Sequence, residues 1–354
     1  MSRNSAKSHG RSIGLGVMAA LGALALTACS GGAADPAASN SATGDQNTPL
    51  TPVTLTLNFL AGGPNSGFMV AKEKGYYADA GLEVTIQEGQ GSNSTASLVA
   101  GGNSEFGFAD GPSAMTVTSQ DGDLINIGQI LQTNGFSVMS LSDQGITDVA
   151  DLEGKSVAVQ PGTAQASLLA AVLAANDVDA GSVEMVNLDP SALVASLLQG
   201  SVDAISAGAD NQGVQLRDQG ADINEILYRD AGVPTIGLSM ITQATWAEEN
   251  PELVSAFVEA SLRGWDDARN DPQAAAEIVA EQFPSGASID AIVKQLEVDI
   301  DLLCAEDSEG LGKAPEANWE TTFDLLVDYL DLPTTLAVTD YYTNDFLPAE
   351  LPSC

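Results

Sequence analysis

The chain has 354 residues, with 12 Lys plus Arg against 48 Asp plus Glu, which gives a formal net charge of −36. So acidic a surface repels nucleic acid and anionic lipid headgroups, and we expect neither as a partner. The only histidine is His9, so histidine-dependent nucleophilic sites and histidine-ligated metal sites are excluded from the rest of the chain. We expect no metal site and no cofactor.

Residues 1–28 have the pattern of a secretory signal peptide. Arg3, Lys7 and Arg11 form a basic head, and residues 13–28 are almost wholly apolar or small. That run is too short for a comfortable membrane span. The segment LTAC that ends at Cys29 resembles a bacterial lipobox, in which the cysteine becomes the lipid-bearing N-terminus after cleavage. The alternative is an ordinary secreted protein with an incidental cysteine.

Residues 29–52 are predicted to form a lipid-anchored flexible tether. They consist mainly of Gly, Ala, Ser, Thr, Asn, Pro and Asp, with scarcely a side chain large enough to bury. Lipidation of Cys29 would hold the protein at the outer face of the cytoplasmic membrane. Cys304 and Cys354 then remain as an even pair in an oxidising compartment, and we predict a disulfide between them. Two separate buried thiols are the alternative.

The chain after the tether alternates strand and helix patterns, which is typical of parallel βαβ units in an α/β fold. With 44% hydrophobic residues, these roughly 300 residues can bury a large core, which we expect to form two lobes. The first set comprises predicted strands at 53–59, 82–87 and 105–109 and predicted helices at 65–77 and 95–100.

A second set of strands and helices follows the first. It comprises predicted strands at 155–159, 183–188 and 202–207 and predicted helices at 164–175 and 191–199. Two phrases resemble each other across the sets: SLVAGGNSEFGFAD at 97–110 and SLLQGSVDAISAGAD at 196–210. Each phrase runs from a helix end through a glycine turn and a buried strand to an aspartate. This internal echo indicates two similar α/β lobes.

Two apolar extended stretches, at 136–141 and 234–242, are predicted to be the strands by which the chain crosses between the lobes and returns. The predicted lobes are therefore residues 53–137 plus 240–354 and residues 138–239.

After the second crossing the chain is predicted to be helical. Asn250 is the expected N-cap and Pro251 the first helical residue. In that helix a face with four-residue spacing is expected to be core: Leu253, Phe257, Ser261 and Trp265.

Candidate ligand-binding residues lie where predicted strands end, because open α/β sheets bind ligands beyond the carboxyl ends of their strands. Five loops meet this condition, at 59–65, 90–95, 110–113, 160–165 and 208–212, and they are rich in Gly, Ser, Thr and Asn. From them we select ten candidates: Phe59, Asn65, Ser92, Asn93, Asp110, Ser113, Gly162, Thr163, Gln165 and Asp210.

The charge of these loops bears on the ligand. None of the basic residues lies in them, whereas Asp110 and Asp210 do. A carboxylate disfavours an anion and accepts hydrogen bonds from an amine or aminopyrimidine. Each aspartate could instead be a helix N-cap, and helix N-termini alone could hold a sulfonate. Phe59 could stack on a flat ring or belong to the core.

Three stretches resemble a known family: LNFLAGGPNSGFMVAKEKGYYADAGLEVTI, SLVAGGNSEFGFAD and DLEGKSVAVQPGT. They are similar to solute-binding proteins that serve ABC importers for aliphatic sulfonates, taurine and thiamine-pyrimidine precursors, over about residues 53–345. The resemblance implies a periplasmic-binding-protein type II fold, in which two α/β lobes hold the ligand in the cleft between them. It also implies an ABC permease in the membrane as partner.

Other stretches point within that family to the pyrimidine-precursor branch: NWETTFDLLVDYLDL, YYTNDFL and AGVPTIGLSMIT. One departure concerns Asn65, which stands where many members have a histidine. The fungal members that make the pyrimidine from their own histidine are excluded as models, because no histidine follows His9.

Three classes of function remain at this stage. The favoured one is a monomeric, lipid-anchored receptor without enzymatic activity, which captures a small polar solute, above all a thiamine-pyrimidine precursor, and delivers it to the permease. Sulfonates, taurine or nitrate are alternative solutes. A hydrolase that uses Asp110 and Asp210 as an acid/base pair is a second class. A structural or adhesive surface protein is the third, and it would not need two echoing lobes with glycine-rich loops.

Overall fold

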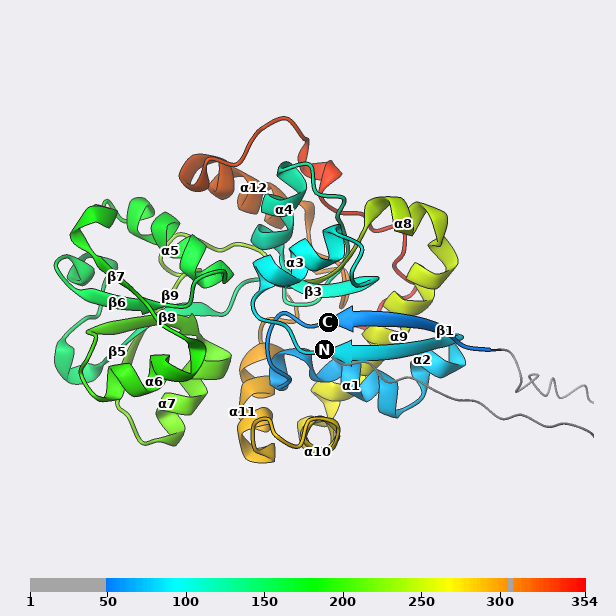
Figure 1. Ribbon diagram of the computed structural model, residues 1–354, viewed down its shortest axis with the longest axis horizontal. Coiled ribbons are helices and arrows are strands. Elements are labelled where there is room, and N and C mark those ends of the chain that lie inside the picture. Colours follow the sequence, from blue (N-terminus) through cyan, green and yellow to red (C-terminus); the bar gives the residue numbers. More distant parts are fainter. Residues whose placement is uncertain (1–48, 305–307) are drawn as a thin grey trace, which may run out of the picture. The chain divides into compact units, whose positions relative to one another are not determined.

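The computed structural model describes residues 49–304 and 308–354 (Figure 1). The predicted signal peptide, Cys29 and all but the last four residues of the predicted tether lie outside the described residues. Within the described ranges, no helix is both long enough and apolar enough to cross a membrane.

The first lobe is built on a five-stranded mixed sheet of order β2-β1-β3-β10-β4. Strands β1, β2 and β3 are parallel, and β10 runs antiparallel to β3 and β4. The strands are β1 (Thr51–Thr56), β2 (Leu82–Gln87), β3 (Phe106–Asp110), β4 (Ile125–Gln129) and β10 (Leu238–Thr242). The helices are α1 (Ser66–Glu73), α2 (Tyr76–Asp79), α3 (Ser92–Ala100), α4 (Gly111–Ser119), α8 (Ala244–Glu249), α9 (Pro251–Asn270) and α10 (Pro272–Gln282).

The second lobe is built on a five-stranded mixed sheet of order β7-β6-β8-β5-β9, drawn in green in Figure 1. Here β6, β7 and β8 are parallel, and β5 runs antiparallel to β8 and β9. The strands are β5 (Phe136–Leu141), β6 (Ser156–Val159), β7 (Glu184–Asn187), β8 (Ala204–Gly208) and β9 (Ile223–Leu227). The helices are α5 (Ala164–Ala175), α6 (Pro190–Leu198), a π-helix (Ala209–Gly213) and α7 (Val214–Asp218).

The two sheets have equivalent strand orders and directions. In each, four strands run parallel to one another and the fourth strand in the order is antiparallel to its two neighbours. The echoing phrases supply equivalent parts, since 97–110 gives the end of α3 and strand β3, and 196–210 gives the end of α6 and strand β8. The predicted two-lobed α/β architecture is therefore confirmed. A repeated local pattern produced a repeated topology, because each unit must bury the same faces of its strands and helices.

The chain crosses between the sheets twice, in segments that precede β5 and β10. The stretch 136–141, predicted as a crossing strand, is itself β5 of the second sheet, and most of the stretch 234–242 is β10 of the first sheet. The segments that precede β5 and β10 are hydrogen-bonded to each other. The backbone N–H of Gly237 donates to the carbonyl of Leu131 at 3.0 Å, and that of Asn134 donates to the carbonyl of Thr235 at 3.0 Å. The side chain of Asn134 also donates to the carbonyl of Val233 at 2.9 Å. The two crossing segments thus run side by side and are hydrogen-bonded to each other.

Two helices follow α10: α11 (Ile289–Ile300) and α12 (Glu316–Leu330). Helix α12 packs against α4 and against α5 of the second lobe. Its Trp319 and Leu326 are buried with side chains of that lobe, such as Leu168. The exact division into residues 53–137 plus 240–354 and residues 138–239 stays a prediction.

Two local details differ from the expectations. The predicted helix at 65–77 is divided into α1 and α2, because Gly75 between them adopts φ of 77°, a left-handed conformation that favours glycine. Asn250 stands at the N-cap position of α9, but its side chain donates to the carbonyl of Trp246 and does not cap the helix. Pro251 begins the helix as predicted.

The predicted core face of α9 is observed. Phe257, Ser261 and Trp265 are fully buried, and Leu253 is partly buried against the same cluster.

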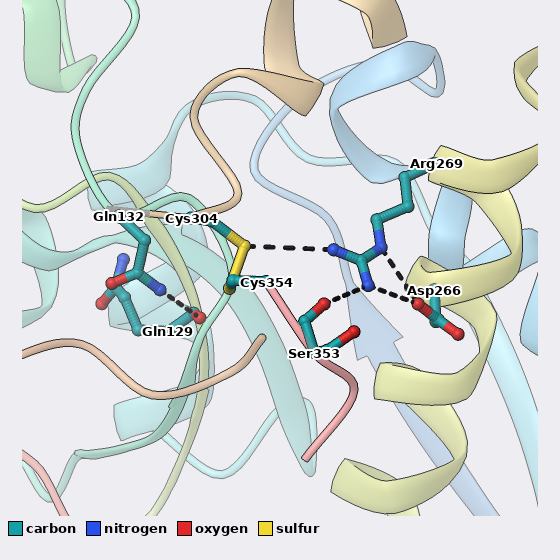
Figure 2. Close-up of a disulfide and its surroundings, with 7 residues drawn as sticks. All are labelled: Gln129, Gln132, Asp266, Arg269, Cys304, Ser353 and Cys354. Carbon is teal, nitrogen blue, oxygen red and sulfur yellow. Dashed lines mark hydrogen bonds and ion pairs between the residues drawn. A yellow bond between two sulfur atoms is a disulfide. The ribbon is translucent and has the colours of Figure 1, made fainter. Parts of the chain in front are cut away.

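The predicted disulfide between Cys304 and Cys354 is present, with a Cα–Cα distance of 5.7 Å (Figure 2). It closes a segment of 50 residues, for which chain entropy contributes about 4 kcal/mol of stability. Arg269 on α9 reinforces this attachment, because its guanidinium donates to the carbonyl of Ser353 and pairs with Asp266. The C-terminal tail is thereby fixed to the first lobe.

Candidate functional site

A cavity of about 540 Å³ opens between the strand-end loops of the two lobes. This volume lies in the range of small-molecule sites. The first lobe contributes the loop 58–65 and residues 91–92, and the second contributes residues 160–165 and 208–215. Four of the five predicted strand-end loops therefore contribute to the cavity, whereas the loop 110–113 does not.

Six of the ten predicted site residues line this cavity: Phe59, Asn65, Ser92, Thr163, Gln165 and Asp210. The other four, Asn93, Asp110, Ser113 and Gly162, are not among its lining residues.

The carboxylate of Asp110 is hydrogen-bonded at the start of the helix that follows it, α4. It accepts from the backbone N–H of Ser113 at 2.9 Å and from the hydroxyl of Ser113 at 3.1 Å, which caps α4. Complete burial raises the pKa of Asp110, while hydrogen bonds from Ser92 and Ser113 oppose that rise. The helix-cap alternative therefore describes Asp110 in this structure, and the acid/base pair of Asp110 with Asp210 is not assembled in the cavity.

Asn65 holds the first loop together. Its Oδ1 accepts from the backbone N–H of Gly62 at 2.9 Å, and its Nδ2 donates to Oδ1 of Asn58 at 3.3 Å and to the carbonyl of Leu60 at 3.4 Å. The side chain is 1% exposed. Asn65 thus shapes the cavity wall, and its polar atoms are already used within the loop.

The two lobes approach each other closely at Gly91. A Cβ atom at this position would lie 2.8 Å from the carbonyl oxygen of Gly162 in the second lobe, and φ of Gly91 is 126°. Only glycine combines that backbone conformation with so near an approach. Gly162, although it does not line the cavity, therefore helps to close one side of it.

The second-lobe wall is formed at the start of α5. Thr163 occupies the N-cap position, and its hydroxyl donates to the carbonyl of Gln160 at 2.8 Å. Gln165 also lines the cavity, and its backbone carbonyl accepts from the hydroxyl of Tyr228 at 3.1 Å.

Helix α11 supplies a wall that the sequence analysis missed. Ala291, Gln295 and Asp299 lie four residues apart on one face of α11 and line the cavity. Asp299 is 1% exposed. A signal for it exists in the sequence: Ile292, Leu296 and Asp299 recur at the spacing of a buried helix face, and an acid in such an apolar position is unusual.

Asp210 and Asp299 face the same cavity from different lobes, and α11 contacts the π-helix that carries Asp210. Burial, followed by the negative charge of Glu225, raises the pKa of Asp210 to about 6. Burial, followed by the charge of Asp210, raises the pKa of Asp299 well above its ordinary value. Two carboxyl groups therefore meet where the lobes come together, in surroundings that disfavour their ionised forms.

The rest of the lining is neutral. Phe59 and Phe136 contribute one aromatic ring from each lobe, and amide side chains are frequent: Asn58, Asn134, Asn211, Gln160, Gln212 and Gln215. Of the described residues that line the cavity, none is a lysine or an arginine. Such a site offers ring surfaces, neutral donors and acceptors, and two carboxyl groups.

The chain belongs to the NMT1/THI5-like family, whose model matches residues 65–275. This confirms the family resemblance that the three sequence stretches indicated.

Two relatives match the chain over most of its length. The riboflavin-binding protein of Chloroflexus aurantiacus is 27% identical over 338 residues, which cover 92% of this chain and 95% of that protein. The formylaminopyrimidine-binding protein of Halalkalibacterium halodurans is 25% identical over 297 residues, which cover 82% and 90%.

A solved structure gives the fold. The alkanesulfonate-binding protein of Xanthomonas axonopodis pv. citri, bound to MOPS, superposes with a TM-score of 0.66 at 17% identity, covering 84% of this chain and 99% of that one. The fold is therefore that of the periplasmic binding proteins, as the sequence predicted.

Proposed function

We propose that this member of the NMT1/THI5-like family is the extracytoplasmic solute receptor of an ABC importer, and that its solute is a thiamine-pyrimidine precursor or a similar aminopyrimidine. The receptor captures the solute in the cavity between the lobes and presents it to the permease. The paired crossings at residues 131–135 and 233–237 act as the hinge on which the lobes close. It works as a monomer.

The observation that carries this proposal is the composition of the cavity wall. Flat rings from Phe59 and Phe136 suit a planar heterocycle. Amide groups suit its ring nitrogens, and the carboxyl groups of Asp210 and Asp299 suit its amino groups. From the predicted set we retain Phe59, Asn65, Ser92, Thr163, Gln165 and Asp210 as lining residues of the binding site, and we add Gln295 and Asp299.

The same wall argues against sulfonate, taurine or nitrate. An oxyanion brought beside two carboxyl groups and no basic side chain would be repelled. A hydrolase that depends on Asp110 has no support, because the carboxylate of Asp110 caps α4. Riboflavin is a second candidate solute, because it is what a relative that covers 92% of this chain is named for.

A thermal-shift screen of the purified chain tests the proposal. Aminopyrimidine thiamine precursors are expected to raise the melting temperature, since a ligand at 100 times its dissociation constant adds about 2.7 kcal/mol of stability. Taurine, alkanesulfonates and nitrate serve as negative controls, and riboflavin as the competing candidate. A shift with sulfonates alone would contradict the choice of solute, and no shift with any of these solutes would contradict the proposed class of ligand.

We further propose that Cys29 carries the lipid anchor after removal of residues 1–28, as its lipobox-like context indicates. Replacing Cys29 with serine is then expected to release the protein from the membrane fraction into the medium. Immunoblots of membrane and medium fractions measure this. If the variant stayed with the membranes in the same amount as the unaltered protein, the lipid-anchor proposal would be wrong.

A further inference from the structure

Asp299 carries a carboxyl oxygen without a partner in a ligand-sized cavity. Its Oδ2 is buried and has no hydrogen-bond partner among the described residues, while the residue as a whole is 1% exposed. Leaving a buried polar group unsatisfied is unfavourable, and more so when the group is charged. The position at the cavity wall indicates that the missing partner belongs to the solute.

A second acid reaches the same space from the other lobe. Asp210 belongs to the π-helix Ala209–Gly213, which follows β8 in the second lobe and packs against α11. Like Asp299, it lines the cavity. A group bound between these two carboxylates would therefore connect the lobes directly.

Among residues 49–304 and 308–354, no basic side chain lines the cavity beside this pair. Arg217 is bound to Glu225 at 2.5 Å, and Lys294 on α11 is paired with Asp218 on α7. Arg229 donates to the carbonyl of Asn134. These three basic residues line a neighbouring cavity, and the ligand cavity has no lysine or arginine in its described lining. Charge compensation must come from the solute.

We propose that Asp210 and Asp299 together bind a positively charged nitrogen of the solute, such as a primary ammonium group, and that this contact draws the two lobes together. The inference rests on the proposed function and narrows its solute to a cation. The aromatic and amide walls hold the ring, and the acidic pair selects for the charge. A neutral solute of equal size leaves both carboxylates uncompensated.

Two pyrimidines of similar size, one cationic and one neutral, test this inference. Both are 4-amino-2-methylpyrimidines; one carries an aminomethyl group at position 5, charged at pH 7, and the other a neutral hydroxymethyl group. Isothermal titration of the purified chain is expected to give about 10- to 100-fold tighter binding of the aminomethyl compound. This factor corresponds to the free energy that a hydrogen bond to a charged group typically contributes. In Asp299→Asn, and separately in Asp210→Asn, this preference is expected to fall to near onefold.

Asp301→Asn is the matched control. Asp301 is an exposed acid two residues beyond Asp299 and does not line the ligand cavity. This variant is expected to retain the full preference for the aminomethyl compound. Circular dichroism and melting temperature verify folding of each variant, and the two independent Asn substitutions guard against a folding defect in either one.

The outcomes separate the inference from the proposed function. Equal affinity for both pyrimidines, or a preference that survives both Asn variants, overturns the acidic pair as a cation site but leaves the receptor. Binding of riboflavin alone, which is neutral, overturns it as well. Stabilisation by Mg²⁺ or Ca²⁺ alone that disappears in Asp299→Asn would identify an inorganic cation and contradict an organic one. Absence of binding by any solute in the screen contradicts the proposed class of ligand, and with it the inference that rests on it.

Discussion

Replacing Trp265 with alanine is expected to lower the free energy of unfolding by about 3 to 5 kcal/mol, the usual loss for a buried tryptophan. Trp265 on α9 is 0% exposed, and its ring lies 5.9 Å from that of Phe68 and 6.1 Å from that of Phe108, measured between centroids. Urea unfolding measures the change. Trp246→Ala, at a partly buried tryptophan of the same lobe, is the matched control and is expected to cost less.

A second substitution tests whether the tryptophan ring fixes the distance between α1 and α9. A Cβ atom on Gly67 of α1 would lie 2.3 Å from Cγ of Trp265, so Gly67→Ala is expected to destabilise the unaltered protein by about 1 to 3 kcal/mol. In the Trp265→Ala background the clash is absent. There, alanine is expected to be neutral or to stabilise the helix by up to about 1 kcal/mol. Equal losses in both backgrounds would contradict this account of the packing.

The conformation that holds Asp210 and Asp299 in one cavity is expected to lose stability in the ligand-free protein as the pH rises from about 4 to about 7. Both carboxyl groups have a folded-state pKa raised above the unfolded value of 3.8. Their contribution to stability is complete below pH 3.8 and is lost as the pH rises through the folded values. A pKa of about 6 for Asp210 corresponds to a share of at most about 3 kcal/mol. Because Asp210 is partly exposed, solvent screening reduces this share.

Urea unfolding at pH 4 and pH 7 measures this loss, with the radius of gyration from small-angle scattering as a readout of lobe separation. The wild-type protein is compared with the double variant Asp210→Asn/Asp299→Asn, because the strongly acidic surface adds its own pH dependence to both. The nearby charges are Glu225, paired with Arg217, and Asp218, paired with Lys294, and they are common to the two proteins. Parallel pH profiles for wild type and variant would refute the assignment to this pair.

The pH response and the cation preference have one physical origin. Two acids that approach each other as the lobes come together repel when ionised, so the ligand-free receptor is biased away from the conformation that encloses the cavity. A cationic solute compensates this repulsion and favours enclosure. Solute binding and lobe closure would thereby be coupled through Asp210 and Asp299.

The sequence by itself determined the α/β class, the two-lobed arrangement and four of the loops that line the cavity. These features depend on local alternation of strand and helix patterns and on the rule that ligands bind beyond strand ends. The similarity between segments 97–110 and 196–210 also predicted that the two lobes would be alike, and their sheets have equivalent topologies. Two cysteines remained once Cys29 was assigned to the lipid anchor, and this predicted the disulfide between Cys304 and Cys354 that the structure contains.

Only the tertiary structure decided what each aspartate does and which residue completes the acidic pair. Asp110 and Asp210 end similar segments, but Asp110 is the last residue of β3 and lies three residues before Ser113, from whose backbone N–H its carboxylate accepts. Asp210 lies two residues beyond the end of β8, in a π-helix that faces α11. Asp299 joins it from a helix 89 positions further along the chain, placed by packing of the C-terminal helices. Local sequence encodes strand ends, whereas the meeting of two distant acids depends on how separate elements bury their apolar faces.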